Sequence, residues 1–393
     1  MTGHDTAAIH HNVLVLSKGT RLLVRCEAAP AGIAPAIGRA LSRSGGRLLL
    51  DGGGRGRGKL LLLEGTPEDL AGAAAAARRH RAGASLADAL EALLRAADRP
   101  PRRLRLRRGF LDLTGTRIMG IVNVTPDSFS DGGRFLAAGD AVRHALRLAD
   151  EGAALLDVGG ESTRPGARPV SLAEELRRVL PVLERLAPAL RRRGPGRPLV
   201  SIDTTKAEVA RRAIEAGADM VNDISGGSFD PAMPAVVAET GVPIVVQHIR
   251  GTPRTMQQAP RYRNLLPDVA RVLRRRMETL RRAGVAEDRM VVDPGIGFGK
   301  TRRDNLVLLR RLHVLRSLGR PILIGASRKS FIGGTLELPV AERLEGSLAA
   351  EALAIAGGAA IIRAHDVRAA VRVARLCDTV LGGPAGRWQD SWV

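Results

Sequence analysis

Short apolar runs alternate with longer amphipathic stretches over the last three quarters of the chain. The apolar runs have the length and near-continuous apolar character of strands buried on both faces, and the stretches between them have the apolar spacing of helices. The runs span 117–124, 154–160, 199–203, 220–225, 243–249, 290–296, 321–327 and 360–366, and the helical segments span 139–151, 171–191, 205–216, 231–239, 266–283, 303–318, 342–357 and 367–380. Eight strand–helix units predict a (β/α)8 TIM barrel, a fold that typically needs about 250 residues. A doubly wound open sheet is the alternative, but no G-x-G-x-x-G follows the first strand.

The first 108 residues have a different pattern, which predicts a small α/β domain before the barrel. Strands are expected at 22–28 and 60–65, and helices at 32–45 and 67–97. The run PPRRLRLRR at 100–108 begins with proline and is strongly basic, so we interpret it as a linker or connecting strand. The expected domains are a basic accessory domain of unknown role, a catalytic barrel and a short C-terminal tail, at 1–108, 109–385 and 386–393.

Composition limits the class of protein further. The net charge of +21 suggests nucleic-acid binding, but the chain has only six Phe, two Trp and one Tyr, and no aromatic residues are interleaved with the arginines of the more basic N-terminal part. No apolar run approaches the roughly 20 residues of a membrane span. Cys26 and Cys377 lie too far apart in sequence to suggest a disulfide framework. We therefore expect a cytoplasmic protein with neither a membrane nor a nucleic acid as partner.

All eight predicted strands end in polar residues, which is where TIM barrels carry their chemistry. Asp203, Asn222 and Asp293 offer two carboxylates and an amide, a set that suits a flat heterocycle rich in N–H donors. A second set offers donors for a phosphate or diphosphate, namely Arg164, Lys329, Arg363 and His365. The pattern indicates a ligand with a polar ring at one end and an anion at the other.

Six motifs in these strand ends also carry a family resemblance. The motifs are IMGIVNVTPDSFSDGG, DVGGESTRPGA, SIDTTK, DPGIGFGK, GASRKSF and RAHDV, beginning at residues 118, 157, 201, 293, 325 and 363. In this order they resemble the dihydropteroate synthase family over the whole predicted barrel. The resemblance implies a transferase of folate biosynthesis in which p-aminobenzoate displaces diphosphate from 6-hydroxymethyl-7,8-dihydropterin diphosphate, giving 7,8-dihydropteroate.

The resemblance also implies residue roles, a metal and an assembly. Catalysis would involve Arg363, Lys329, His365 and Asp203. The pterin would be bound by Asp203, Asn222, Gln247, Asp293, Phe298, Gly325, Lys329 and Arg363. The p-aminobenzoate would meet Phe129, Thr163, Arg164 and Ser330, and the diphosphate Asn123, Arg164, Arg363 and His365. Mg²⁺ would lie at Asn123, and the expected partners are the two small-molecule substrates and a second copy of the chain in a homodimer.

Several residues near these motifs have a simpler structural interpretation. Asp157 and Asp223 would anchor loops or cap helices, and Glu161 would pair with an arginine. His248 would be a satisfied interior histidine. Lys206 would be solvated or support the site from behind, and Lys300 would be a loop lysine near the pterin pocket.

The sequence departs from the family at position 247, where the family commonly has a methionine that packs on the pterin face. Gln247 packs less well but can form hydrogen bonds, which leaves the exact pterin and arylamine open. The alternatives are a related condensation in methanopterin synthesis, with a bulkier arylamine, and a pterin-dependent methyltransferase domain. A basic RNA- or protein-binding module is a third, and the complete set of polar strand ends argues against it.

Overall fold

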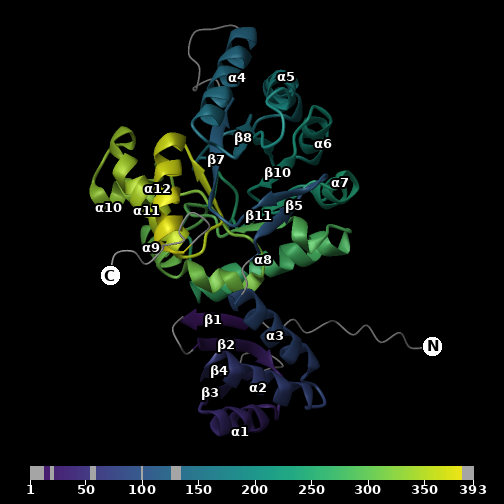
Figure 1. Cartoon of the computed structure of the whole chain (residues 1–393), viewed down its shortest axis with the longest axis vertical. Helices are drawn as coiled ribbons and strands as arrows, with labels where there is room; N and C mark the ends of the chain where they lie inside the picture. Colours follow the sequence, from purple (N-terminus) through teal and green to yellow (C-terminus); the bar gives the residue numbers. More distant parts are fainter. Residues whose placement is uncertain (1–12, 18–21, 54–58, 99–100, 125–133, 383–393) are drawn as a thin grey trace, which may run out of the picture. The chain divides into compact units, whose positions relative to one another are not determined.

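The computed structural model describes residues 13–17, 22–53, 59–98, 101–124 and 134–382 (Figure 1). Contacts between residues divide the chain into two compact units, one over residues 1–100 with 313–319 and the other over 101–312 and 320–393. The division falls after Pro100, so the rest of the basic run 100–108 lies with the second unit. Each unit has its own core and is described separately.

The N-terminal unit is a four-stranded antiparallel sheet with three helices. The strands follow the order β1-β2-β4-β3 and span Val13–Ser17 (β1), Leu22–Ala29 (β2), Arg47–Gly53 (β3) and Lys59–Gly65 (β4). The helices span Ala34–Ser44 (α1), Pro67–Arg78 (α2) and Ala84–Asp98 (α3). Val24, Leu61 and Leu63 of the sheet share a buried cluster with Ile37 and Leu70 of the helices.

Two features of this unit differ from the sequence-based expectation. The strands β1 and β3 were not expected, because neither has a clear alternation of polar and apolar residues. The alanine-rich run 67–97 forms two helices rather than one. They separate near Gly83, where a Cβ atom would lie 1.9 Å from the carbonyl oxygen of Ala77, so the tight connection requires glycine.

The second unit is an eight-stranded parallel barrel, as predicted. The sheet order is β12-β11-β10-β9-β8-β7-β14-β13, and a parallel bridge between Val292 and Ile322 joins its two ends. The strands span Arg117–Asn123 (β7), Leu155–Gly159 (β8), Leu199–Asp203 (β9), Met220–Asp223 (β10), Ile244–Gln247 (β11), Met290–Asp293 (β12), Leu323–Ile324 (β13) and Ile361–Ala364 (β14).

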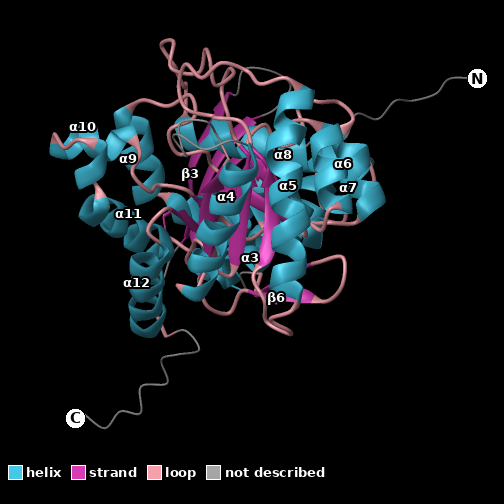
Figure 2. Ribbon diagram, turned by 90° about the horizontal axis from the view of Figure 1, so that it is seen from above, coloured by secondary structure: helices cyan, strands magenta, loops and turns pink. Residues whose placement is uncertain are grey.

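Helices alternate with these strands and cover the barrel from outside (Figure 2). They span Arg134–Asp150 (α4), Leu172–Arg191 (α5), Ala207–Glu215 (α6), Met233–Thr240 (α7), Leu265–Arg282 (α8), Arg302–Arg310 (α9), Leu344–Ala356 (α11) and Val367–Val380 (α12). An additional short helix, Ser330–Leu336 (α10), follows β13. Among the described helices, none has the length and apolar character that crossing a membrane requires.

A hairpin closes the amino end of the barrel. Its strands, Arg103–Arg105 (β5) and Phe110–Asp112 (β6), pair antiparallel. Leu104 and the neighbouring Leu113 are buried in one cluster with the first interior residues of the barrel strands, including Met119 and Leu155. The polar strand ends therefore remain at the opposite, carboxyl end of the barrel, where TIM barrels hold their active sites.

Candidate active site

Four consecutive strands present buried polar side chains at their carboxyl ends. Asp203 pairs in register with Asn222, and Gln247 pairs in register with Asp293. All four are at most 8% exposed. The strands bring together the four residues that we had expected to bind a heterocycle, because the carboxyl ends of parallel strands meet at one end of the barrel.

Arg363 is the centre of an ion-pair network at this end. Its Nε atom donates to Oδ2 of Asp157 at 2.6 Å, and Nη2 donates to Oδ2 of Asp203 at 2.8 Å. The amide of Asn222 donates to the same oxygen of Asp157 at 2.9 Å. Asp157 is fully buried. Asp157 is therefore part of the polar centre of the site. The sequence alone did not distinguish this role from that of a loop anchor.

The network shifts the proton affinity of its members. Burial and the neighbouring Asp157 carboxylate raise the pKa of Asp203 to about 7, although the Arg363 guanidinium opposes this. Burial also raises the pKa of Asp293, while Lys329 acts in the opposite direction. The site thus holds carboxyl groups that exchange protons nearer to neutral pH than ordinary aspartates.

Lys329 lies between the aspartate side of the site and Phe298. Its Nζ donates to the carbonyl of Ile296 and lies 4.5 Å from the centroid of the Phe298 ring. Burial lowers the pKa of Lys329 to about 8, and the Asp293 carboxylate limits that fall. Gly325 lies beside Arg363, since a Cβ there would be 3.6 Å from the Arg363 Cβ. Ser330, the first residue of α10, is exposed.

Three buried polar atoms of this site have no partner among the described residues. They are Oδ1 of Asp157, Oδ1 of Asn222 and Nε2 of Gln247. A buried polar group without a hydrogen bond costs roughly 1–3 kcal/mol, so such groups are usually paired by a ligand or by water. Two acceptors and one amide donor match a heterocycle that carries both N–H groups and acceptor atoms.

The residues expected at the anion side are brought together only in part. His365 hydrogen-bonds Ser327 Oγ through Nδ1 at 3.1 Å, and burial together with Arg363 lowers its pKa to about 4. At neutral pH it therefore supplies a neutral N–H and not the positive charge that we expected. Arg164 is exposed on the loop after β8, and its charge also acts on His365.

The remaining expected residues lie around this centre or outside the described part. Thr163 lines a cavity of about 250 Å³ that also contacts Asp203, Phe229 and Pro253. Asn123 ends β7 and is half-buried. Phe129 lies outside the described residues.

A second ion cluster, which was not predicted, supports the loops after β8 and β9. Lys206 Nζ donates to Glu161 and, at 2.5 Å, to Oε2 of the fully buried Glu175. We expected an arginine partner for Glu161 and placed Lys206 in solvent or behind the site. No local pattern in the sequence shows which carboxylates Lys206 meets.

Two other groups near the motifs have structural roles. His248 is buried and its Nδ1 lies 2.9 Å from Nζ of Lys300, which is fully buried as well. Burial lowers the pKa of both groups well below their ordinary values. Asp223 accepts hydrogen bonds from the backbone N–H groups of Ser225 and Gly227, both at 2.7 Å, and so anchors the loop after β10.

The described residues include no cluster of three or more His, Cys, Asp or Glu that could hold a metal ion. This does not conflict with the expected Mg²⁺ site, because Mg²⁺ keeps several waters and needs one or two protein ligands beside substrate phosphates. The amide oxygen of Asn123 is a hard oxygen ligand of the kind that Mg²⁺ accepts, and it lies at the open end of the barrel.

Comparison with known proteins identifies the family to which the barrel belongs. A family described as pterin binding enzyme matches residues 119–365. Dihydropteroate synthase of Synechocystis sp. is 47% identical over 67% of this chain and 90% of its own length, and that of Escherichia coli strain K12 is 45% identical over 69% and 94%. Among solved structures, Xanthomonas albilineans dihydropteroate synthase with 4-aminobenzoic acid superposes with a TM-score of 0.66, at 45% identity, over 72% of this chain and 99% of its own. The same enzyme in complex with 7,8-dihydropteroate gives 0.63 at 42% identity, over 72% of this chain and all of its own. The chain therefore belongs to the pterin binding enzyme family and, within it, to the dihydropteroate synthases.

Proposed function

We propose that the protein joins 6-hydroxymethyl-7,8-dihydropterin diphosphate to p-aminobenzoate, releasing diphosphate and 7,8-dihydropteroate. The observation that carries this proposal is the set of unpaired buried atoms on Asp157, Asn222 and Gln247 beside the Arg363 network. These atoms suit a pterin ring, and the guanidinium lies where an attached anion can reach it. The relatives in complex with 4-aminobenzoic acid and with 7,8-dihydropteroate support the same pair of substrates.

In this proposal the pterin lies across the ends of β9 to β13. Asp203, Asn222, Gln247 and Asp293 hydrogen-bond its edges, and Lys329 bonds a ring atom from the other side. Phe298 and Gly325 line the pocket, where glycine leaves room beside Arg363. Lys329 needs no bidentate geometry for this contact, which suits a compact ammonium better than a planar guanidinium.

The reaction requires stabilisation of a leaving group more than activation of a nucleophile. The arylamine nitrogen is neutral at pH 7 and attacks the pterin methylene carbon, while the C–O bond breaks and its electron pair leaves with the diphosphate. The amine then loses one proton to solvent. Negative charge grows on the leaving oxygens, and preorganised donors placed there lower the barrier.

Arg363 and His365 would supply those donors. Asp157 and Asp203 use two of the five N–H groups of Arg363, which leaves three for the diphosphate. The two carboxylates also hold the guanidinium in place before the substrate arrives, so little reorganisation is needed during the reaction. Bound Mg²⁺, held by Asn123 and the diphosphate oxygens, would neutralise further charge on the leaving group.

The p-aminobenzoate would enter from the open end of the barrel. Thr163 and Arg164 belong to the loop after β8, and Ser330 lies exposed at the start of α10. We propose that this loop closes over the arylamine, with Phe129 also contacting it and Ser330 near its carboxylate. Closure would exclude water, which competes with the amine for the methylene carbon.

We also propose that the protein is a cytoplasmic homodimer. Leu353 of α11 and Leu376 and Val380 of α12 are all more than 60% exposed. The two helices pack side by side on the barrel, so these side chains offer an apolar surface to a second copy (Figure 1). The described cysteines, Cys26 and Cys377, are both free, which agrees with a reducing compartment.

One experiment distinguishes the proposed reaction from two alternatives. The purified protein is incubated with the dihydropterin diphosphate, Mg²⁺ and labelled p-aminobenzoate, and in parallel with a labelled ribosylated arylamine or a methyl donor. The proposal predicts coupled product from p-aminobenzoate in preference to the bulkier arylamine. Preferred turnover of the ribosylated arylamine would leave the proposed reaction standing but show that the assigned arylamine substrate is wrong. Methyl transfer without release of diphosphate would show that the protein catalyses a different reaction.

A further inference from the structure

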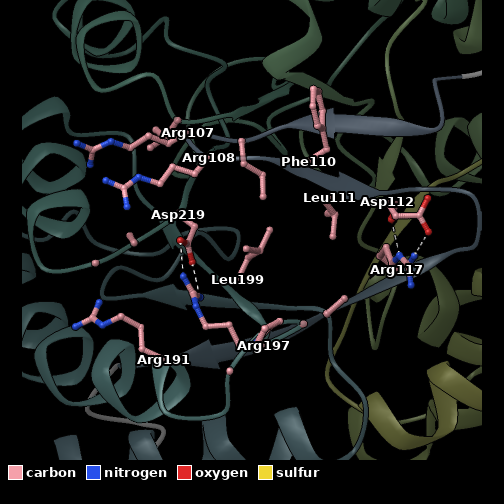
Figure 3. Close-up of a pocket in the computed structure, with 18 of the residues that line it drawn as sticks. Arg107, Arg108, Phe110, Leu111, Asp112, Arg117, Arg191, Arg197, Leu199 and Asp219 are labelled. Carbon is pink, nitrogen blue, oxygen red and sulfur yellow. Dashed lines mark hydrogen bonds and ion pairs between the residues drawn. The ribbon is translucent and has the colours of Figure 1, made fainter.

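A pocket at the amino end of the barrel, opposite the active site, has no role in the proposed reaction (Figure 3). It has a volume of about 780 Å³, which is within the range of small-molecule sites. The β5–β6 hairpin forms one wall, and the segments that lead into β7, β8, β9 and β10 form the other. Strand β9 is five residues long, so this pocket lies about 13 Å or more from the catalytic end.

The charge of the lining is unbalanced. Five arginines but only two aspartates line the pocket. Arg197 is held by Asp219 through two hydrogen bonds of 2.9 and 2.8 Å, and Arg117 is held by Asp112 at 2.6 Å. The other three, Arg107, Arg108 and Arg191, have no carboxylate or hydrogen-bond partner for their side chains among the described residues.

The three unpaired arginines are not scattered around the pocket. Figure 3 shows Arg107 and Arg108, from the β5–β6 turn, and Arg191, from the end of α5, reaching to the same side of the pocket around the Arg197–Asp219 pair. Asp219 also accepts a hydrogen bond from the backbone N–H of Val200 at 2.9 Å, so this pair is fixed to the start of β9. Three exposed guanidinium groups thus lie on one side of a fixed ion pair.

Apolar side chains form the adjoining part of the pocket. Leu111 and Leu199 lie beside the cationic end, whereas the ring of the neighbouring Phe110 points away from Leu111 (Figure 3). Consecutive residues of a strand face opposite sides of it, so Phe110 does not add to the surface that the two leucines form. The leucines provide an apolar surface next to the cations, on which the body of a ligand can pack.

We propose that this pocket binds a small organic polyanion, with phosphate or carboxylate groups on Arg107, Arg108 and Arg191 and an apolar or flat body over Leu111 and Leu199. Guanidinium groups recognise both kinds of anion through paired N–H donors. The apolar side chains distinguish this pocket from a basic surface patch, because a simple anion would contact only the arginines.

The test is calorimetric titration of the full-length protein with ATP, without Mg²⁺, as a polyanion with a flat body. Adenosine is titrated as the body without the charges, and benzene-1,3,5-tricarboxylate as the carboxylate counterpart. ATP is expected to bind and adenosine is not. If the tricarboxylate binds more tightly than ATP, the natural ligand is a carboxylate, and if less tightly, a phosphate.

Variants of the lining locate the binding. Arg191→Ser and the double variant Arg107→Ser/Arg108→Ser should each weaken ATP binding roughly tenfold, the effect of losing a charge-assisted contact. The changed residues are exposed, so the fold should persist. Neither variant should alter the synthase activity, because the pocket lies at the other end of the barrel.

Arg192→Ser is the matched control, since Arg192 is the next residue, is also exposed and does not line the pocket. Its affinity for ATP should equal that of the unchanged protein. An equal loss in Arg192→Ser and Arg191→Ser would show diffuse attraction to a chain of net charge +21 and overturn the proposal. Binding that none of the lining variants weakens would place the anion elsewhere, such as the catalytic end, and no binding of either anion would also overturn it.

Discussion

At the scale of single residues, the account depends most on Arg363. The guanidinium is bonded to two buried carboxylates and still has donors for a diphosphate. Removing it should lower kcat/KM by about 10²-fold or more, the effect of losing one preorganised donor to the transition state. Arg368→Ala is the control, because Arg368 lies on the exposed side of α12 and is 68% exposed. Arg363→Ala with kcat/KM near that of the control would refute the role proposed for this residue.

The pH dependence of kcat/KM should depend on Asp203 and Lys329. In the free protein the pKa of Asp203 is about 7 and that of Lys329 is about 8. If the pterin needs a carboxylate and an ammonium, activity rises as Asp203 loses its proton and falls as Lys329 loses its own. The expected profile is a narrow bell with its maximum between these values. A profile that is flat from pH 6 to pH 9 would contradict this assignment.

Gln247 should strengthen the binding of the pterin and lower the stability of the protein without its substrate. Its Nε2 is buried without a partner, so Gln247→Met should raise the free energy of unfolding by about 1–3 kcal/mol. The same change should raise the KM for the dihydropterin diphosphate, because the amide hydrogen bond to the pterin is lost. Denaturant unfolding and steady-state kinetics measure the two effects. Gln247→Glu or Gln247→Leu tests whether shape alone explains them, and an unchanged KM in Gln247→Met would remove this residue from pterin binding.

Sequence reasoning identified most of the residues at the site but not how they pair. Strand-end position placed Asp203, Asn222 and Asp293 together, because parallel strands end at one face. The pairing of Arg363 with Asp157 joins residues 206 positions apart, and no local pattern reports such a contact. The neutral state of His365 also depends on its burial and on neighbouring arginines, neither of which the sequence shows.

At the scale of elements, the eight strand–helix units were predictable because burial on both faces makes parallel strands continuous apolar runs. Helix α9 begins at Arg302, one residue before the start expected from the sequence, because the Thr301 side chain accepts from the backbone N–H of Asp304 and caps the helix. The hairpin β5–β6 was harder to predict. Its few apolar residues lie among arginines, and only Leu104 and Leu113 show that it packs against the barrel.

The cluster of Lys206, Glu161 and Glu175 should stabilise the loops between β8, α5 and α6. Lys206→Met removes the partner of the fully buried Glu175, whose pKa burial already raises. The expected loss of unfolding free energy is on the order of 2 kcal/mol, less than for a fully buried pair because Lys206 is 26% exposed. Adding Glu175→Gln to Lys206→Met should restore part of the lost free energy of unfolding.

The exposed pair Arg211–Glu239 provides the control for this prediction. Arg211→Met should cost much less than Lys206→Met, since its pair is solvated. Equal losses in Arg211→Met and Lys206→Met, measured by urea unfolding, would show that the cluster contributes no more than a surface ion pair.

At the scale of the whole molecule, the two units should be separable. The N-terminal unit has its own sheet and buried cluster, and the pterin-binding match begins only at residue 119. We propose that residues 1–100 form an accessory domain, and that a chain lacking them folds and keeps kcat/KM within roughly twofold. Circular dichroism and the synthase assay test this. A folded but inactive barrel would instead make the first unit part of the enzyme.

The central claim is that this barrel couples a pterin diphosphate to an arylamine. The most direct test measures released diphosphate and labelled 7,8-dihydropteroate together, with and without p-aminobenzoate. The account predicts one diphosphate for each dihydropteroate, and almost no diphosphate when the arylamine is absent. Diphosphate release that does not depend on p-aminobenzoate, or no dihydropteroate from the intact protein, would contradict it.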